Sequence, residues 1–181
     1  RGGIVALAAS ASVYSYRRLG KWVATFSVAA VLAAIVVLGP TRVNQMQADE
    51  ESAQGRIVSW SEGLQMLKSQ PVFGVGWNRF TDFHPKVAHN SFVQIIAETG
   101  LVGGFFFVGV AFAYFMCLLA VRRTGSERSG AREFTDALVA SGVGLLTGAA
   151  FLSRQDSPPF YMVIALGAAY AGLRGAGAVL A

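Results

Sequence analysis

The residues best suited to chemistry lie in one polar stretch, from about Thr41 to Ala88, and just beyond its end. His89 begins a His-Asn-Ser triplet that leads into an apolar run. Histidine titrates near neutral pH and can remove a proton from a hydroxyl group. Arg56 lies upstream, and arginine offers paired N–H donors that fit phosphate oxygens. A lone histidine in a polar loop is more often only solvated, so residue type alone leaves both interpretations open.

A polar stripe follows the triplet. Asn90, Gln94 and Glu98 are spaced by four residues, so they share one side of a predicted helix that is otherwise apolar. A carboxylate inside a membrane segment is costly and usually faces a cavity or a partner group. The stripe therefore predicts either substrate contacts or hydrogen bonds that fasten helices together. Arg79 and Lys86 are further candidates for binding phosphate groups, either of a substrate or of a lipid, with ordinary surface charge as the alternative.

No metal and no cofactor are expected. Neither histidine has a partner at the spacing typical of helical metal ligands, and Cys117 is remote in sequence. Asp82, His84 and His89 around a cation remain a minor alternative. Gly74-Val75-Gly76 lacks the surroundings of a phosphate-binding loop, so we interpret it as a structural turn.

The elements that must position these residues are predicted to be membrane helices. Hydrophobic residues make up 54% of the 181 residues and charged residues only 14%, whereas soluble domains average about 25% charged. Several apolar runs approach the length of about 20 residues that crosses a bilayer. The predicted fold class is an all-α integral membrane protein, a polytopic helical bundle of about five transmembrane helices with one external, partly helical loop domain.

The spans divide the chain into five parts. We expect two transmembrane helices in 1–40, the external domain in 41–90, a transmembrane helix entered from an interfacial segment in 91–123, a cytoplasmic loop in 124–133, and two further transmembrane helices in 134–181. Basic residues near the span ends then fall on one side, which marks it as cytoplasmic. These residues are Arg17, Arg18, Lys21, Arg122, Arg123, Arg128, Arg132 and Arg174. The net charge of +5 therefore reflects topology, and nucleic-acid binding is excluded.

The external domain contains one predicted helix, from about Gly55 to Ser69, which ends because Pro71 disfavours helical geometry at Gln70. Arg56 falls at the edge of its apolar face. That face is predicted to consist of Ile57, Trp60, Leu64 and Leu67.

Taken in order, these motifs resemble the O-antigen ligase and O-antigen polymerase superfamily over residues 1 to 121. Arg1-Gly2-Gly3 is similar to the Ser-Arg-Gly motif of that family. The other residues that carry the resemblance are Gly55-Arg56, Trp60, Pro71, Gly74-Val75-Gly76, Phe80, His89-Asn90-Ser91, Gln94, Glu98, Gly100 and Gly103. The chain opens on Arg1 directly before an apolar run, and we expect a larger N-terminal part to precede it and this fragment alone to be inactive.

The resemblance implies a metal-independent, inverting glycosyltransferase that uses glycans carried on undecaprenyl pyrophosphate. It implies that His89 is the essential histidine and that Arg56 and Arg1 are the essential arginines. The implied partners are a lipid-linked glycan donor, a glycan or lipid acceptor, and membrane lipids. The implied location is the bacterial inner membrane, with the loop 41–90 on the periplasmic side. An O-antigen ligase, a polysaccharide polymerase and a protein-glycosylating relative share this chemistry.

Two other classes of function remain open at this point. A transporter of a sugar or lipid-linked glycan would use Glu98 and Gln94 to line a polar path. A non-catalytic membrane scaffold would use the external domain to bind envelope partners. Substitution of His89 separates them from the enzyme, because only the enzyme needs that side chain.

Overall fold

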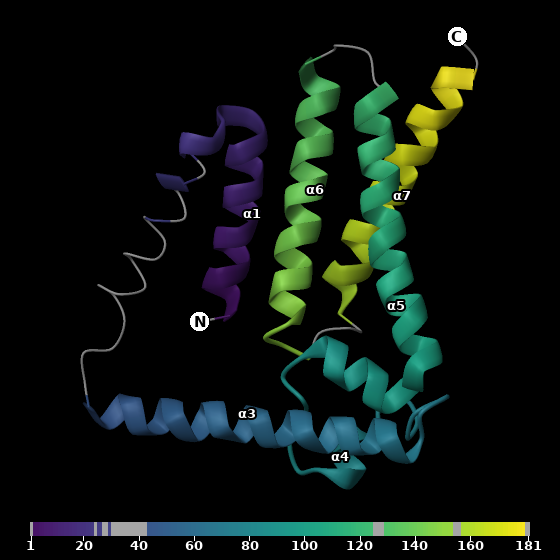
Figure 1. The fold of residues 1–181 in the computed structure, drawn as a ribbon. Helices are drawn as coiled ribbons and strands as arrows, with labels where there is room; N and C mark the ends of the chain where they lie inside the picture. Colours follow the sequence, from purple (N-terminus) through teal and green to yellow (C-terminus); the bar gives the residue numbers. More distant parts are fainter. Residues whose placement is uncertain are drawn as a thin grey trace. The chain divides into compact units, whose positions relative to one another are not determined.

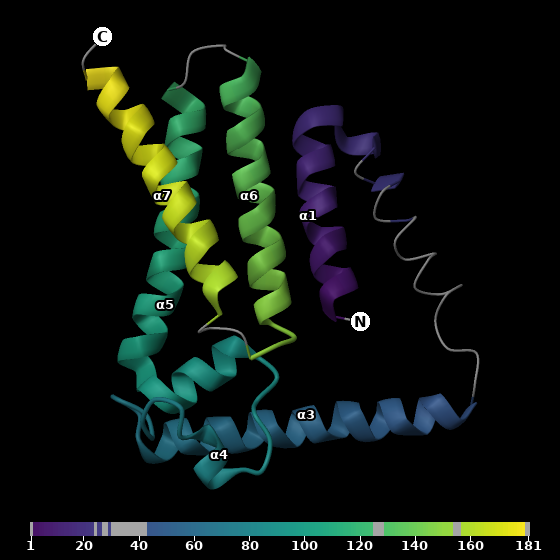
Figure 2. The same ribbon diagram turned by 180° about the vertical axis from the view of Figure 1, so that it is seen from behind.

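The computed structural model describes residues 2–23, 25, 26, 29, 43–124, 129–153 and 157–179. Every regular element in these ranges is a helix, which confirms the predicted all-α class (Figures 1 and 2). The helices are α1 (Gly2–Leu19), α3 (Val43–Ser69), α4 (Phe80–Phe83), α5 (Ser91–Thr124), α6 (Ser129–Ala149) and α7 (Pro158–Val179).

Among the described helices, the segment Ser91–Arg123 of α5 is long and apolar enough to cross a membrane, with a mean hydropathy of 2.3. That finding rests on length and composition. The bundle of about five spans stays a prediction, and most of the second predicted span, 22–38, lies outside the described residues.

The chain forms two compact units. The bundle unit comprises Arg1–Val31, Gly109–Gly148 and Asp156–Ala181, and the loop unit comprises Leu32–Val108 and Ala149–Gln155. In the bundle unit, α6 lies between α1 and the later part of α5, and α7 crosses α5 (Figures 1 and 2).

Close helix contacts hold the bundle unit together. Ser10 on α1 donates a hydrogen bond to the carbonyl of Ala140 on α6, at 3.0 Å. A Cβ atom at Gly144 would lie 1.8 Å from the Ser10 hydroxyl oxygen, so α1 and α6 approach each other there because glycine has no side chain. Tyr114 on α5 donates to the carbonyl of Leu138 on α6, at 2.6 Å.

In the loop unit, α3 begins at Val43 rather than Gly55 and ends at Ser69, where Pro71 predicts an end. Of the predicted apolar face, Trp60 and Leu67 are half-buried, whereas Ile57 and Leu64 are 62% and 46% exposed. The packed face is rotated about the helix axis toward smaller residues. It consists of Arg56, Ser59, Trp60, Gly63, Met66 and Leu67.

The rotation has a steric cause. A Cβ atom at Gly63 would lie 2.7 Å from Val93 on α5, so only glycine lets the two helices approach this closely. Ser59 beside it is also small and 1% exposed. Close backbone approach therefore outweighs the burial of the larger Ile57 and Leu64, and it brings Arg56 from the edge of the predicted face onto the packed face.

Helix α5 is broken at Gly100, which has φ 67° and ψ −163°. This region of backbone conformation is accessible almost only to glycine. The break divides α5 into a first segment, residues 91–99, and a second segment, residues 101–124. The prediction that the first segment lies in the membrane interface is not tested by this break.

The turn that follows α3 caps the end of the first segment. The N–H of Val75 donates to the carbonyl of Ala97 at 3.0 Å, and the N–H of Gly76 donates to the carbonyl of Glu98 at 2.9 Å. Carbonyls in the last turn of a helix have no partner within the helix, so the turn supplies the missing donors. A Cβ atom at Gly74 would lie 2.4 Å from the Glu98 backbone, which explains the glycine there.

The same turn also caps the start of the second segment. The N–H of Leu101 donates to the carbonyl of Pro71 at 2.9 Å, and the N–H of Val102 donates to the carbonyl of Val72 at 3.2 Å. A Cβ atom at Gly100 would lie 2.3 Å from the Val72 carbonyl oxygen. The break in α5 and the turn after α3 are therefore one structure, joined through backbone atoms.

We predict that Gly100→Ala strongly destabilises the protein. The new methyl group would collide with Val72, and the backbone conformation alone costs about 1–3 kcal/mol for a residue other than glycine. Gly109→Ala in the same helix is the matched control, since nothing lies within 4 Å of its added Cβ. Thermal unfolding in detergent micelles should show a large loss for Gly100→Ala and no loss for Gly109→Ala. Equal melting temperatures would contradict the proposed packing at the break.

Candidate functional site

His89 lies directly before the N-terminus of α5 and has a left-handed backbone, with φ 51°. Asn90 caps that helix, since its Oδ1 accepts the N–H groups of Phe92 at 2.9 Å and Val93 at 3.3 Å. An asparagine in this position satisfies amide donors that have no partner within the helix. The observed hydrogen bonds of Asn90 thus fix the backbone next to His89.

A tryptophan on α3 forms a hydrogen bond with the residue that precedes His89. The indole N–H of Trp60 donates to the carbonyl of Ala88 at 2.8 Å, and Ala88 is fully buried. Arg56 lies one turn before Trp60 on the packed face of α3. The structure therefore brings the helix that carries Arg56 and the loop that carries His89 together through one hydrogen bond.

The side chains of His89 and Arg56 are both half-buried. Neither makes a hydrogen bond or an ion pair with another residue whose side chain the structure describes. An imidazole with a free ring nitrogen can accept a proton, and a free guanidinium can bind an anion. Arg1, the second predicted arginine, lies outside the described residues.

Glu98 has internal partners for both carboxylate oxygens. Its Oε2 accepts the N–H of Asn78 at 3.1 Å, and its Oε1 accepts the N–H of Phe80 at 3.3 Å and the amide of Gln94 at 3.0 Å. The side chain is 1% exposed. A buried carboxylate requires such donors because unpaired charge is costly away from water. These contacts hold the backbone at residues 78 and 80 against α5, and a role of Glu98 in binding substrate stays a prediction.

In the side-chain amide of Gln94, the nitrogen has a hydrogen-bond partner and the oxygen has none. Its Nε2 donates to Glu98, which leaves Oε1 buried without a hydrogen-bond partner. The hydroxyl of Ser153 is also buried and without a partner. The neighbouring backbone is tied to α5, because Ser91 donates to the carbonyl of Leu152 at 2.6 Å. Sequence reasoning missed Ser153, since only the fold brings residues 152–153 to the first segment of α5.

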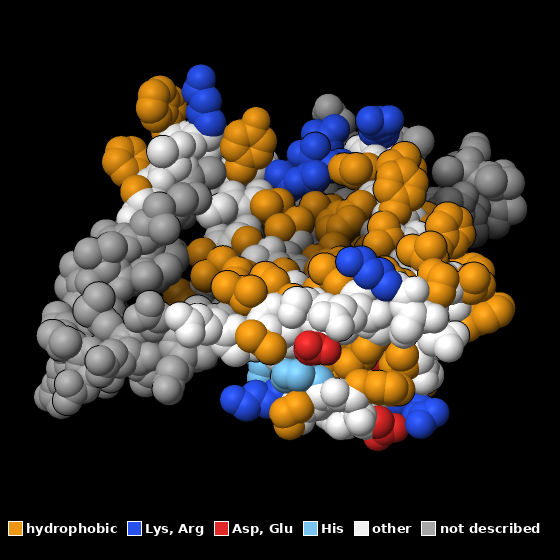
Figure 3. All heavy atoms as spheres, turned by 60° about the horizontal axis from the view of Figure 1, so that its bottom comes forward, with side chains coloured by type: hydrophobic (Ala, Val, Ile, Leu, Met, Phe, Trp, Pro, Cys, Tyr) orange, Lys and Arg blue, Asp and Glu red, His pale blue; other side chains and the backbone are white. Residues whose placement is uncertain are grey.

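The remaining predicted residues lie around α4. Arg79 pairs with Asp82 at 2.9 Å, and both side chains are more than half exposed, so the pair contributes little to stability. His84 forms a local turn, in which its Nδ1 lies 2.8 Å from the carbonyl oxygen of Lys86. Lys86 itself is exposed. Figure 3 shows one face on which histidine, basic and acidic side chains gather beside hydrophobic ones.

The arrangement separates residues that hold the backbone from residues that can react. The side chains of Asn90, Trp60 and Glu98 form hydrogen bonds with backbone groups of the protein. His89 and Arg56 keep their polar atoms available. The Trp60–Ala88 hydrogen bond links the helix that bears Arg56 to the residue before His89.

We predict that Glu98→Gln lowers the free energy of unfolding by about 1–3 kcal/mol, because the amide removes one acceptor from a buried backbone N–H. Asp82→Asn is the control, since that carboxylate is exposed and paired only at the surface. Chemical denaturation in detergent micelles measures both. If the two variants were equally stable, the carboxylate of Glu98 would not be holding the 78–80 loop.

The comparisons with known proteins identify a family for most of the chain. The family model described as O-antigen ligase matches residues 1–108, which include Arg56, His89 and the broken start of α5. Neither a curated protein nor a solved structure matches the chain. The match covers more than half of the 181 residues and confirms the resemblance that the sequence motifs indicate. The chain belongs to the O-antigen ligase family.

Proposed function

We propose that the protein is a membrane glycosyltransferase that moves a glycan from undecaprenyl pyrophosphate to an acceptor hydroxyl. Membership of the O-antigen ligase family supports the general class. The observation that carries the proposal is the half-buried His89, whose ring has no hydrogen-bond partner among the described side chains, next to the helix that bears Arg56.

His89 acts as the general base in this proposal. A ring nitrogen takes the proton of the acceptor hydroxyl as its oxygen forms a bond to the anomeric carbon. The bond between that carbon and the phosphate oxygen breaks with its electron pair, and the lipid pyrophosphate leaves. Attack from the opposite face inverts the anomeric configuration. The leaving group is already a stable anion, so the reaction needs charge stabilisation more than a general acid.

Arg56 supplies that stabilisation. Its guanidinium offers planar, paired donors to phosphate oxygens, which lysine does not match in geometry. Its place on the packed face of α3, one turn from Trp60, is consistent with this role. We assign Arg1 the same role toward the donor, as the family resemblance implies.

The other candidates divide between positioning and binding. Asn90 and Glu98 act as positioning residues, because their observed hydrogen bonds are internal. Gln94 has a buried Oε1 without a hydrogen-bond partner, and an acceptor hydroxyl reaches this atom only if the surrounding side chains move. Lys86 and Arg79, both exposed, contact donor or acceptor phosphates. A transporter that uses Glu98 to line its path is less well supported, since that carboxylate is held by three N–H donors.

We predict that His89→Ala lowers transfer at least about a hundredfold, since general base catalysis contributes that much or more. We expect Arg56→Ala to lower it about a hundred- to a thousandfold, as is typical when one transition-state donor is lost. The assay follows transfer of a lipid-pyrophosphate-linked glycan by the full-length protein in liposomes, with chelator present.

Two variants control for folding and for loss of charge. His84→Ala removes a histidine that is engaged in a local turn, and Lys68→Ala removes an exposed cation from α3. Both should keep activity near that of the wild type. Full activity of a well-inserted His89→Ala variant would refute the assignment of the base, and loss of wild-type activity in chelator would refute a metal-independent reaction.

A further inference from the structure

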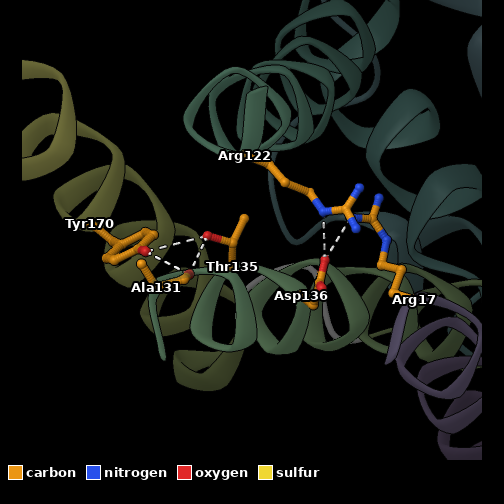
Figure 4. Close-up of polar contacts among 6 residues, drawn as sticks. All are labelled: Arg17, Arg122, Ala131, Thr135, Asp136 and Tyr170. Carbon is orange, nitrogen blue, oxygen red and sulfur yellow. Dashed lines mark hydrogen bonds and ion pairs between the residues drawn. The ribbon is translucent and has the colours of Figure 1, made fainter. Parts of the chain in front are cut away.

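In the bundle unit, one buried carboxylate is shared by two arginines. Oδ1 of Asp136 on α6 lies 2.9 Å from Nη1 of Arg17 on α1 and 3.0 Å from Nε of Arg122 on α5 (Figure 4). The Asp136 side chain is only 3% exposed. One negative charge therefore faces two positive charges, so the group of three keeps an excess positive charge.

A cavity of about 420 Å³ opens beside this group. Its lining residues are Tyr16, Arg17, Gly20, Lys21 and Arg122. Lys21 adds a third cation, and none of the described residues that line the cavity is acidic. Glu133, the nearby acid on α6, is paired with Arg18. The cavity is open to solvent, since most of its lining residues are exposed, so it suits a charged group that stays in contact with water.

The backbone explains how Arg17 and Lys21 come to line one cavity. Helix α1 ends at Leu19, and Gly20 has φ 91°, a left-handed conformation that glycine adopts at helix ends. The chain changes direction there before Lys21. Cations from two separate helices thus converge at this turn, which is more specific than a stripe of basic residues along one helix.

The aromatic residues at this turn indicate the level in the membrane at which the turn lies. Tyr16 and Trp22 are 63% and 70% exposed, and the Lys21 ammonium lies 5.6 Å from the centre of the Trp22 ring. Exposed tyrosine and tryptophan beside lysine are typical of the level of the lipid headgroups. The predicted topology puts this level on the cytoplasmic side, where anionic lipids concentrate basic segments.

We propose that this cavity binds the phosphate group of an anionic phosphate ester. Arg17 and Arg122 each use one N–H toward Asp136, and no described residue accepts their remaining donors, which bind the phosphate together with Lys21. The phosphate neutralises the excess charge of the cluster and ties α1 to α5. The site uses neither His89 nor Arg56, so it is independent of the proposed transfer reaction.

Native mass spectrometry of the full-length protein tests the proposal, with phosphatidylglycerol as the probe and phosphatidylcholine as the neutral reference. Lys21→Gln should weaken phosphatidylglycerol binding about fivefold, the effect of one basic residue near an anionic surface. Lys21 makes no contact with Asp136, so the variant leaves the buried ion pairs intact. Arg123→Gln is the matched control, because it removes one exposed charge that does not line the cavity.

Competition with inorganic phosphate distinguishes the two sources of the ligand. Displacement of phosphatidylglycerol by millimolar phosphate would support the site with a soluble phosphate ester as its ligand, and resistance to it would support a lipid headgroup. Equal weakening by Lys21→Gln and Arg123→Gln, or equal binding of phosphatidylcholine, would overturn the proposal. Transfer activity is measured in parallel, and loss of His89 should leave phosphatidylglycerol binding unchanged.

Discussion

The docking of the turn after α3 onto the break in α5 is the contact on which the loop unit depends. Four backbone hydrogen bonds satisfy both helix ends at Gly100, where unpaired amides and carbonyls would otherwise be buried at a considerable cost. Gly74 and Gly100 are needed there because a Cβ atom on either would overlap backbone atoms of the other segment. This contact fixes the direction of the first segment of α5, and the N-terminus of that segment carries the loop with His89.

The motif residues of the family therefore perform two physical tasks. Pro71, Gly74 and Glu98 hold the turn and the 78–80 loop against α5, mainly through backbone groups. His89 and Arg56 are left with free polar atoms at the end of this framework. A change in a framework residue would shift His89 and Arg56 without altering either side chain, so motif membership alone does not distinguish catalysis from positioning.

Local signals predicted the helix end before Pro71, the glycine turn and the polar stripe. They did not predict the packing and the hydrogen bonds that depend on contacts between segments distant in sequence. The apolar pattern of α3 did not indicate that Ser59 and Gly63 pack on α5, because contact with Val93 selects small residues and carries no local signal. Two of the three partners of Glu98 are backbone amides of residues 78 and 80, which carry no sequence signal, whereas the third, Gln94, belongs to the predicted stripe.

The position of Arg56 follows from the same packing. The small residues at 59 and 63 let α3 approach α5, and Arg56 lies on the same face one turn before Trp60. A half-buried cation loses part of its hydration, and it is stable only where water or an anion can reach it. None of the described carboxylates pairs with Arg56. Arg56 is half-buried, so water still reaches its guanidinium, and in the proposed reaction the donor phosphate takes the place of that water.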